Sequence, residues 1–355
     1  MNKKKVCMII PSFTAKGGIA AVASGYRDSR LEQDFDIRYI QTYCDGNKIK
    51  KLFMAIKSYF VFLFYLLFWK PNLIHIHSSF GPSFYRKKFF IDHAFINKIP
   101  IINHIHGAEF DSFYRNTNSR KKELIKKTYN KCTYFIALSD EWKENLSEII
   151  DENKIIVIEN YSIINLKAVS ERRNKINTNT VLFLGFICER KGCYDIPGVA
   201  KIVLSKIPDA TFILAGSGEI EKIKSIADSE VLKHIIFPGW VRGNEKDDLL
   251  KKSDIFFLPS YNEGMPMSIL DAMGYGLPVV STTVGGITKI VHDGENGYVT
   301  SPGNIDVFAE SIIRILTDDN LKQKMTNKSV EIINNKFSLN QHIDKITELY
   351  KRFLY

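Results

Sequence analysis

The chain reads IFFLPSYNEGMPMSILDAMGYGLPVVS at residues 255–281. Two apolar runs, 255–259 and 278–281, flank a loop and one segment of helix length, which is the pattern of a strand, a helix and a second strand. Runs made almost wholly of apolar residues are typical of parallel strands that are covered on both faces. The stretch therefore predicts one βαβ unit of a parallel sheet.

Apolar runs of strand length recur along the whole chain, separated by segments of helix length. They lie at 6–11, 73–77, 101–106, 134–139 and 155–159, and again at 181–185, 211–215, 234–238, 255–259 and 278–281. A polar stretch at 162–180 interrupts the series and is the best candidate for a linker. We therefore expect an α/β fold with two Rossmann-like parallel-sheet domains facing across a cleft, at residues 1–165 and 178–337.

Length and composition exclude several protein classes. A chain of 355 residues with 45% hydrophobic and 25% charged residues suits two folded domains and excludes a disordered or collagen-like protein. The five cysteines are scattered without metal-ligand spacing, which favours a reducing compartment. The apolar run at 6–10 is too short for a signal peptide, so we expect a cytoplasmic protein.

The net charge of +10 is unevenly distributed. Residues 1–165 carry 25 lysines and arginines against 16 acidic residues, whereas the remainder carries 24 against 23. A surplus in one half favours an anionic partner such as a phosphorylated ligand, a membrane surface or nucleic acid. No recognised nucleic-acid-binding motif accompanies the basic half, so we do not expect nucleic acid. A generally lysine-rich composition is the alternative explanation.

The segment YFVFLFYLLFW at residues 59–69 is unusually apolar, and four lysines precede it at positions 48, 50, 51 and 57. A helix over 59–69 extends only about 16 Å, which is less than the roughly 30 Å of a hydrocarbon core. It is therefore not expected to span a bilayer. Basic residues beside an aromatic-rich helix favour an interfacial membrane element, and a buried core helix is the alternative.

The loop that follows the strand at 255–259 carries the residues with the clearest chemistry. It presents Glu263 and Gly264, and a helix is predicted to begin near Pro266, a favourable residue in a first turn. The free amides at a helix start favour an anionic ligand such as a diphosphate. Asp271 lies eight residues after Glu263 and can share the same site. Two carboxylates beside a phosphate site suit hydrogen bonds to sugar hydroxyls.

This loop and helix resemble the E-x7-E signature of family 4 retaining nucleotide-sugar glycosyltransferases, which have the two-Rossmann GT-B fold. Further segments resemble the motifs of that family in the same order along the chain. They are PSFTAKGGIA at 11–20, HIHGAEF at 104–110, GFICERKG at 185–192, AGSGE at 215–219, VGGI at 284–287 and HDGENG at 292–297. The similarity covers nearly the whole chain.

The resemblance implies roles for individual residues. Glu263 would contact the donor sugar and support positive charge at its anomeric carbon, Lys191 would neutralise the departing diphosphate, and His106 would pack near the donor sugar. Donor-binding roles are implied for Gly17, Gly18, Arg190, Gly264, Met265, Pro266 and Asp271. No metal or other cofactor is expected, because Lys191 and the helix-start amides would neutralise the leaving group.

Two positions depart from the pattern of the family. Asp271 is one methylene shorter than the usual glutamate, which shortens its reach toward a ribose. Phe186 stands where the family usually has an arginine, which removes a phosphate-binding cation. Arg190, next to Lys191, is a candidate substitute.

The repeated HIH sequences at 75–77 and 104–106 place pairs of imidazoles on one face of a strand. No neighbouring carboxylate or thiol completes a recognisable metal site, so His75, His77 and His104 are expected to be structural or acceptor-side residues. The sequence GSG at 216–218 lacks the third glycine of a dinucleotide fingerprint, which disfavours an oxidoreductase.

The expected activity is therefore transfer of a sugar from a nucleotide-diphosphate sugar, with retention, to a saccharide acceptor. The basic half and the segment at 59–69 favour a lipid-linked acceptor in surface polysaccharide biosynthesis, at the inner face of the cell membrane. Arg86, Lys87 and Lys88 are candidate acceptor-side phosphate contacts. Similar proteins return a final helix, here 338–355, to the N-terminal domain. A sugar-nucleotide epimerase on the same fold and a catalytically silent binding subunit are the alternatives.

Overall fold

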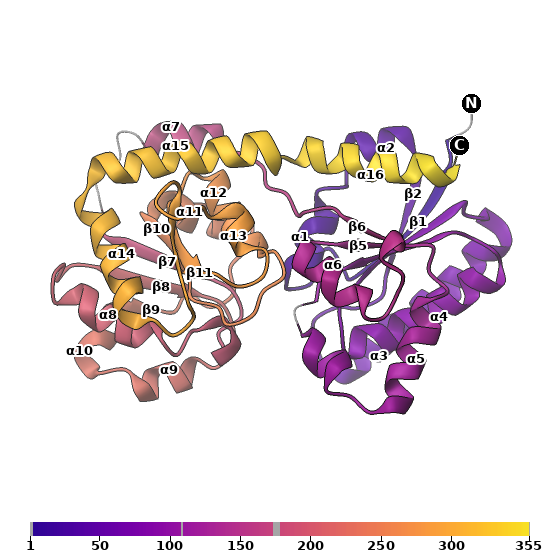
Figure 1. Cartoon of the computed structure of the whole chain (residues 1–355), viewed down its shortest axis with the longest axis horizontal. Helices are drawn as coiled ribbons and strands as arrows, with labels where there is room; N and C mark the ends of the chain where they lie inside the picture. The colour runs from indigo at the N-terminus through magenta and orange to yellow at the C-terminus, as the bar shows by residue number, and fades with distance from the viewer. Residues whose placement is uncertain (1–2, 108, 173–177, 355) are drawn as a thin grey trace. The chain divides into compact units, whose positions relative to one another are not determined.

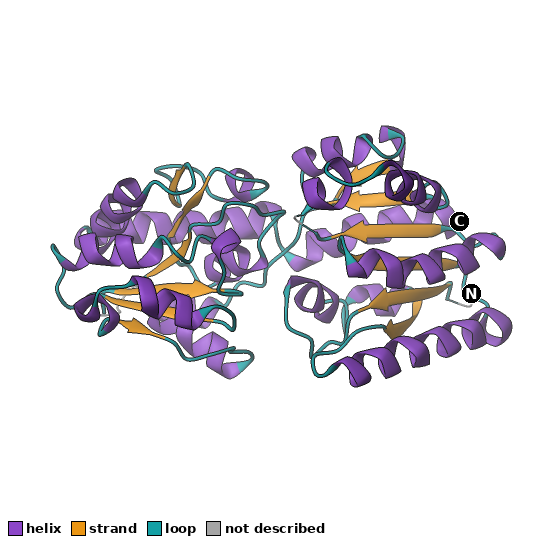
Figure 2. Cartoon of the chain, turned by 90° about the horizontal axis from the view of Figure 1, so that it is seen from below, coloured by secondary structure: helices purple, strands orange, loops and turns teal. Residues whose placement is uncertain are grey.

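The computed structural model describes residues 3–107, 109–172 and 178–354. The chain forms two compact units, which we call unit 1 (Met1–Asn160 with Leu339–Tyr355) and unit 2 (Tyr161–Ser338) (Figure 1). Each unit is built on one parallel sheet with helices on both of its faces (Figure 2).

Unit 1 contains a six-stranded parallel sheet in the order β2-β1-β3-β4-β5-β6. Its strands are β1 (Lys5–Ile10), β2 (Asp36–Gln41), β3 (Leu73–Ser78), β4 (Ile101–Ile105), β5 (Tyr134–Ala137) and β6 (Ile155–Val157). The inner strands β3 and β4 are buried along their whole length, which explains their near-continuous apolar sequences.

The helices of unit 1 follow its strands in βαβ fashion, and several begin at a capping side chain. Asn47, Asn118 and Ser139 each accept a hydrogen bond from a backbone amide in the first helical turn. The helices are α1 (Gly18–Ser24), α2 (Arg30–Asp34), α3 (Lys48–Phe64), α4 (Pro82–Ile96), α5 (Ser119–Tyr129), α6 (Asp140–Ser147) and α16 (Leu339–Leu354), with short turns η1 (Tyr65–Trp69), η2 (Asp111–Arg115) and η3 (Glu152–Lys154).

Unit 2 contains a second six-stranded parallel sheet, in the order β12-β11-β10-β7-β8-β9. Its strands are β7 (Thr180–Leu184), β8 (Thr211–Ala215), β9 (Ile235–Ile236), β10 (Ile255–Leu258), β11 (Val279–Thr282) and β12 (Gly297–Thr300). Strand order reverses between β7 and β10, the arrangement of a doubly wound nucleotide-binding sheet. Ligands of such sheets bind outside the carboxyl ends of the strands at this reversal.

The helices of unit 2 cover both faces of this sheet (Figure 1). They are α7 (Leu166–Arg172), α8 (Ile196–Leu204), α9 (Ile220–Ile226), α10 (Ser229–Leu232), α11 (Asn244–Lys252), α12 (Met267–Gly274), α13 (Ile287–Ile290), α14 (Ile305–Thr317) and α15 (Asp319–Lys336), with a short turn η4 (Glu189–Lys191).

The predicted linker at 162–180 is in part a helix. Helix α7 occupies residues of this stretch, and Arg172 at its end donates to the backbone carbonyls of Leu250, Ser253 and Tyr275 at 2.7–3.0 Å. These bonds attach α7 to the rest of unit 2 and satisfy the donors of the Arg172 guanidinium. The polar sequence of this stretch does not predict them. The part of the predicted linker at 173–177 lies outside the described residues.

Two strands were absent from the sequence prediction, β2 and β12, and both lie at an edge of their sheet. Their sequences, DIRYIQ and GYVT, are only partly buried. An edge strand pairs with a neighbour along one edge only and is less buried than a central strand. Its sequence therefore lacks the continuous apolar run of a central strand.

The apolar segment at 59–69 belongs to a longer helix than the sequence predicted. Helix α3 and η1 run on as one helical stretch, Lys48–Trp69, of 22 residues, which includes the lysines that precede the apolar run. By length and composition alone this stretch could cross a membrane, so the expected exclusion on length is wrong. However, Phe62 and Trp69 on its inner side are part of the hydrophobic core of unit 1.

The final helix α16 belongs to unit 1, although unit 2 separates it from the rest of that unit in the sequence. Its Tyr350 and His342 are buried, and the Tyr350 hydroxyl is hydrogen-bonded to His75 on β3 at 2.6 Å. Lys345 of α16 forms an ion pair with Glu159 at 2.7 Å. The apolar side of α16 is thus an integral part of the interior of unit 1.

Candidate functional site

The reversal of strand order in unit 2 positions two loops side by side. One loop follows β7 and leads into η4, and the other follows β10 and leads into α12. The amide of Tyr261 in the second loop donates to the carbonyl of Arg190 in the first at 2.8 Å. The loops that the sequence predicted to bind the donor therefore lie together at the ligand-binding edge of the sheet.

Lys191 and Glu263 meet between these loops as an ion pair, in which the Lys191 ammonium donates to Oε1 of Glu263. Both side chains are largely withdrawn from solvent, with 14% and 7% of their surfaces exposed. Ser260 donates its hydroxyl to the same carboxylate oxygen at 2.7 Å. A buried carboxylate needs such partners, and here they fix its position within the loop between β10 and α12.

Backbone contacts that only glycine allows hold the two loops close. Gly192 has a φ of +69°, and a Cβ at this position would lie 1.9 Å from the carbonyl oxygen of Pro259. Arg190 donates to the carbonyl of Asn262 at 2.8 Å, so part of its guanidinium fixes the loop that carries Glu263. The sequence prediction that Arg190 binds phosphate remains a prediction.

A third loop closes around the residues that follow Glu263. Gly285 has a φ of +55°, and a Cβ there would lie 2.0 Å from the carbonyl oxygen of Glu263. The Gly286 amide donates to the Gly264 carbonyl at 2.6 Å, while Met265 is buried. Pro266 forms the N-cap of α12, so the chain turns from this loop directly into the helix, as the sequence predicted.

Asp271 lies on α12 and forms an ion pair with Lys246 of α11 at 3.1 Å. Both side chains are partly exposed, so the pair is accessible to a ligand. Sequence reasoning identified Asp271 but missed Lys246 and Ser260. Ser260 lies three residues before Glu263 and could have been found from this spacing, whereas Lys246 is one of several lysines on α11 and carries no distinguishing signal.

Phe186, which replaces the usual arginine, lies after β7 with 51% of its surface exposed. An exposed aromatic ring supplies no positive charge for a phosphate, so this position does not share that role with Lys191.

The remaining predicted site residues lie in unit 1. Gly17 is the N-cap of α1 with a φ of +117°, and Gly18 begins that helix. His106 follows β4 and is partly exposed. Its amide donates to the Ser78 carbonyl at 2.8 Å, and its Nε2 is hydrogen-bonded to Nδ1 of His77 at 2.9 Å. Unit 1 therefore places His106 at the carboxyl end of its own sheet.

The histidines around His106 are held in the neutral form. Burial, and to a lesser extent the neighbouring imidazoles, lower the pKa of His75 and of His106 to about 3. The pKa values of His77 and His104 lie well below the usual range for the same reasons, burial first. Neutral imidazoles can act as hydrogen-bond donors, acceptors and metal ligands.

The predicted acceptor-side cations differ from one another in the structure. Lys87 is not on the surface: only 3% of it is exposed, and its ammonium donates to the hydroxyl of Thr42 at 2.7 Å. Burial lowers its pKa well below the usual range. The prediction of a phosphate contact for Lys87 is therefore corrected to an interior role. Lys88 is ion-paired with Asp92, and Arg86 is partly buried with its guanidinium against the ring of Tyr43.

Residues 20–161 match the family described as Glycosyltransferase Family 4, and residues 167–331 match the family described as Glycosyl transferases group 1. The chain belongs to glycosyltransferase family 4. It is thus an enzyme of a retaining glycosyltransferase family, as the motifs of the sequence indicated.

Two curated relatives of this glycosyltransferase are named for a lipid-linked acceptor and for capsular polysaccharide biosynthesis. It is 29% identical to the UDP-Gal:alpha-D-GlcNAc-diphosphoundecaprenol alpha-1,3-galactosyltransferase of Escherichia coli over 79% of this chain and 75% of the relative. It is 26% identical to the capsular polysaccharide biosynthesis glycosyltransferase CapM of Staphylococcus aureus over 63% of this chain and 62% of the relative.

Solved structures show the fold. Sucrose-phosphate synthase from Thermosynechococcus elongatus is 14% identical, with a TM-score of 0.80 and 99% of each chain covered. The HepE protein of Anabaena in complex with UDP is 18% identical, with a TM-score of 0.73 over 98% of this chain and 100% of that chain. The glycosyltransferase therefore has the GT-B fold, as predicted.

Proposed function

We propose that this glycosyltransferase moves a sugar from a UDP-sugar, with retention of anomeric configuration, to a saccharide acceptor linked to a lipid. The buried Lys191–Glu263 pair carries the donor part of the proposal, because it places a cation and a carboxylate at the ligand-binding edge of the unit 2 sheet. The Escherichia coli relative is named for a UDP-galactose donor, and HepE was solved with UDP-glucose. These names support UDP as the nucleotide.

The proposed reaction uses the two partners of the ion pair differently. The bond between the anomeric carbon and the diphosphate oxygen breaks, and the acceptor oxygen forms its bond to the anomeric carbon on the same face. The acceptor proton passes to the leaving diphosphate. Lys191 stabilises the negative charge that develops on the diphosphate, while Glu263 faces the positive charge that develops on the sugar.

Because Lys191 is bonded to Glu263 before the donor arrives, the site keeps both charges in place without a ligand. An arriving diphosphate adds a second anion to Lys191, so the ammonium can be shared between the diphosphate and the carboxylate. A preorganised charge of this kind needs little rearrangement during the reaction.

The outer face of the helical stretch formed by α3 and η1, Lys48–Trp69, supports the lipid part of the proposal. Its exposed apolar side chains recur at helical spacing, each between 44% and 78% exposed: Ile49, Leu52, Phe53, Ile56, Phe60, Phe64, Leu67 and Phe68. We call these eight side chains the apolar stripe. A continuous stripe of large apolar residues on a folded surface is typical of a membrane or protein contact.

Charge favours an anionic membrane as the partner of the apolar stripe. Lys48, Lys50 and Lys57 are exposed on the same helix. Each basic side chain near an anionic bilayer surface contributes about 1 kcal/mol of binding. The inner side of this helix packs in the core of unit 1, which favours a helix lying on the membrane over one that crosses it. A lipid-linked acceptor would reach the enzyme at this surface.

The donor part is tested by comparing the wild type with Glu263→Gln. UDP, UDP-glucose, UDP-galactose and UDP-N-acetylglucosamine would be titrated by calorimetry, and transfer would be measured to N-acetylglucosamine-diphosphoundecaprenol. Glutamine keeps an oxygen for Ser260 and Lys191, so UDP should still bind. Transfer should fall about 10²- to 10³-fold, as when a transition-state partner is removed elsewhere.

Glu310→Gln is the matched control, because Glu310 is an exposed glutamate on α14 of the same unit. It should leave both measurements unchanged. Full transfer by Glu263→Gln would contradict the assigned site. Conversion of the UDP-sugar without acceptor would instead favour an epimerase, and binding without turnover on any acceptor would favour a silent subunit.

The lipid part is tested by co-sedimentation with phosphatidylglycerol and phosphatidylcholine vesicles at low salt. The wild type should bind the anionic vesicles more strongly, and Phe53→Ser with Phe60→Ser should abolish most of that binding. Ile226→Ser is the control, because Ile226 is an exposed apolar residue of unit 2. A wild type that stays in the supernatant with anionic vesicles would overturn this part without affecting the donor site.

A further inference from the structure

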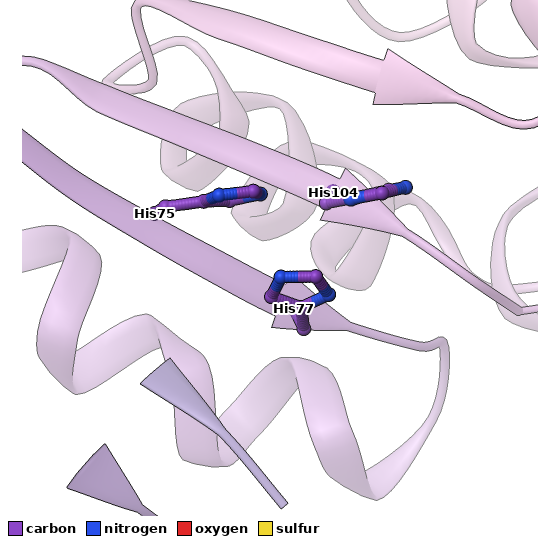
Figure 3. A group of neighbouring side chains, drawn as sticks. All are labelled: His75, His77 and His104. Atoms are coloured by element: carbon purple, nitrogen blue, oxygen red, sulfur yellow. The ribbon is translucent and has the colours of Figure 1, made fainter. Parts of the chain in front are cut away.

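Three histidines of neighbouring strands converge inside unit 1. His75 and His77 lie on β3 and His104 lies on β4, and none is more than 1% exposed (Figure 3). His77 and His104 are direct partners in the register of the two strands, so their side chains share one face of the sheet. One ring nitrogen from each of the three histidines lies within 4.8 Å of the other two.

Most of the ring nitrogens in this cluster lack a hydrogen-bond partner. They are Nε2 of His75, Nε2 of His77, and both Nδ1 and Nε2 of His104. A buried polar atom without a partner costs about 1–3 kcal/mol, and native structures contain few of them. Four such atoms in one cluster indicate that the cluster has a ligand.

The other nitrogens of the β3 histidines are oriented by residues behind them. Nδ1 of His75 is hydrogen-bonded to the Tyr350 hydroxyl at 2.6 Å, and Nδ1 of His77 is hydrogen-bonded to His106 at 2.9 Å. Histidines that bind metals typically use one nitrogen for the metal and the other for such an orienting bond. In both residues the orienting bond leaves Nε2 as the remaining ligand atom.

We propose that His75, His77 and His104 bind a divalent transition metal, with Zn²⁺ as the best match. Imidazole nitrogens suit zinc, copper, nickel and cobalt, whereas magnesium and calcium require oxygen ligands. Three histidines with a fourth position for solvent form a known type of zinc site. The sequence provides no neighbouring carboxylate or thiol to complete a metal site. In the structure a third imidazole, from the adjacent strand, takes that place.

Metal binding requires a small rearrangement of the rings. Zinc–nitrogen bonds of about 2.0–2.1 Å place tetrahedral ligand atoms roughly 3.3 Å apart, whereas the atoms here lie up to 4.8 Å apart. Binding therefore requires rotation about the side-chain torsions of these histidines to close the gap.

The site lies in unit 1, whereas Lys191 and Glu263 lie in unit 2. A bound metal would act on His106 through His77. A metal on Nε2 of His77 leaves the proton on Nδ1, which then donates to Nε2 of His106. Occupancy of the site would therefore fix the tautomer of His106, with its own proton on Nδ1.

The test uses the full-length, untagged protein after removal of metals with a chelator. Co²⁺ is the probe, because its visible absorption reports coordination by nitrogen ligands and the number of ligands. One equivalent per chain should produce the bands of a tetrahedral or five-coordinate ion, and Zn²⁺ should displace them. Zn²⁺ should also raise the unfolding temperature of the wild type, because a ligand stabilises the state that binds it.

Two variants, His75→Gln and His104→Asn, should each weaken Co²⁺ binding by 100-fold or more. His93→Asn is the matched control, because His93 is a histidine of unit 1 on α4 whose Nδ1 is hydrogen-bonded to the Phe89 carbonyl. Its Co²⁺ spectrum should equal that of the wild type. Circular dichroism and UDP binding to unit 2 verify that each variant is folded.

Absence of Co²⁺ bands and of a Zn²⁺ effect on the folded wild type at millimolar metal would overturn the proposal. Bands that persist in His75→Gln and His104→Asn would place the ion elsewhere and overturn it equally. Because UDP binding is measured in the presence of chelator, failure of the metal site and failure of the donor site are distinguishable.

Discussion

The two units carry similar sheets but present opposite chemistry at the carboxyl ends of their strands. In unit 2 the reversal of strand order is flanked by a charged pair, Lys191 and Glu263. In unit 1 the strands β3 and β4 end in imidazoles that burial keeps neutral. Nearly the same parallel scaffold thus serves a charged ligand in one unit and an uncharged or metal ligand in the other, and the difference depends on a few residues after each strand.

The first and largest expected effect follows from removing the positive charge of Lys191 at the ligand-binding edge of the unit 2 sheet. Lys191→Met leaves the hydrogen bond from Ser260 to Glu263 in place, and removes the cation that faces the diphosphate. Transfer should fall about 10²- to 10³-fold, and UDP should bind more weakly. Lys201→Met is the control, because Lys201 is ion-paired with Asp228 on the surface of the same unit. An unchanged rate of transfer in Lys191→Met would contradict the claim that unit 2 uses this charged pair to bind its ligand.

A second expected effect compares two glycine-to-alanine substitutions in unit 2, one that causes both a steric clash and a strained φ and one that causes the strained φ alone. Gly192→Ala should lower the free energy of unfolding of unit 2 by about 3 kcal/mol, through a left-handed φ and a clash with the Pro259 carbonyl. Gly294→Ala has a similar φ of +72° but no atom within 4 Å, so it should lose only about 1 kcal/mol. Peptide-resolved hydrogen exchange would measure both variants. Equal losses would mean that the close approach of the loops adds nothing to stability.

A third expected effect is the loss of stability of unit 1 at low pH, which tests whether its buried histidines are neutral. Burial lowers the pKa of His342 to about 4, while the Glu159 carbonyl raises it slightly. The unfolded chain therefore takes up this proton near pH 6.5 and the folded chain only near pH 4. Stability from this group is complete above pH 6.5 and is lost as the pH falls to about 4, by about 2 to 3 kcal/mol.

Urea unfolding in the presence of chelator, followed by hydrogen exchange in unit 1, would measure this slope. His342→Gln should make it less steep by the share of this group, because glutamine can accept from Tyr26 without titrating, whereas the other buried histidines of unit 1 keep their own shares. His292→Gln, in unit 2, is the control and should leave the slope of unit 1 unchanged. A slope in unit 1 that is the same with and without His342 would contradict the assignment.

The smallest expected effect concerns the second carboxylate of unit 2. Asp271→Asn keeps the size of the side chain but loses the charge that holds Lys246. If Asp271 accepts hydrogen bonds from a ribose, the dissociation constant of UDP should rise about tenfold, which is about 1.4 kcal/mol. Asp306→Asn on α14 is the control, since Asp306 lies outside the loops of the site. A dissociation constant that does not change would assign Asp271 to the Lys246 ion pair alone.

The sequence predicted the central strands and the motifs of the unit 2 loops, because both leave a continuous local pattern. A fully buried parallel strand such as β10 reads as an unbroken apolar run. A loop that must pass between two others needs glycine at fixed positions, as Gly192 and Gly285 show. These features depend on residues that are close together in the chain.

Features set by contacts between distant residues were not predicted. The edge strands β2 and β12 lack an apolar run. Helix α7 was predicted as a linker because its sequence is polar, and the hydrogen bonds of its Arg172 are made to residues far along the chain. Lys87 was expected on the surface from its neighbours Arg86 and Lys88, but its place on α4 faces the interior of unit 1. Helical spacing gives the face of a residue only after the packing of that helix is known.

The return of α16 to unit 1 has a consequence for how the protein is made. Unit 2 is one uninterrupted stretch, so it can fold as soon as it leaves the ribosome. Unit 1 emerges first but lacks the helix that supplies Tyr350 and His342 to its interior until residues 339–354 have been translated. The half of the enzyme that begins first is therefore the half that is finished last, and a chaperone would find its unfinished interior exposed throughout synthesis of the other.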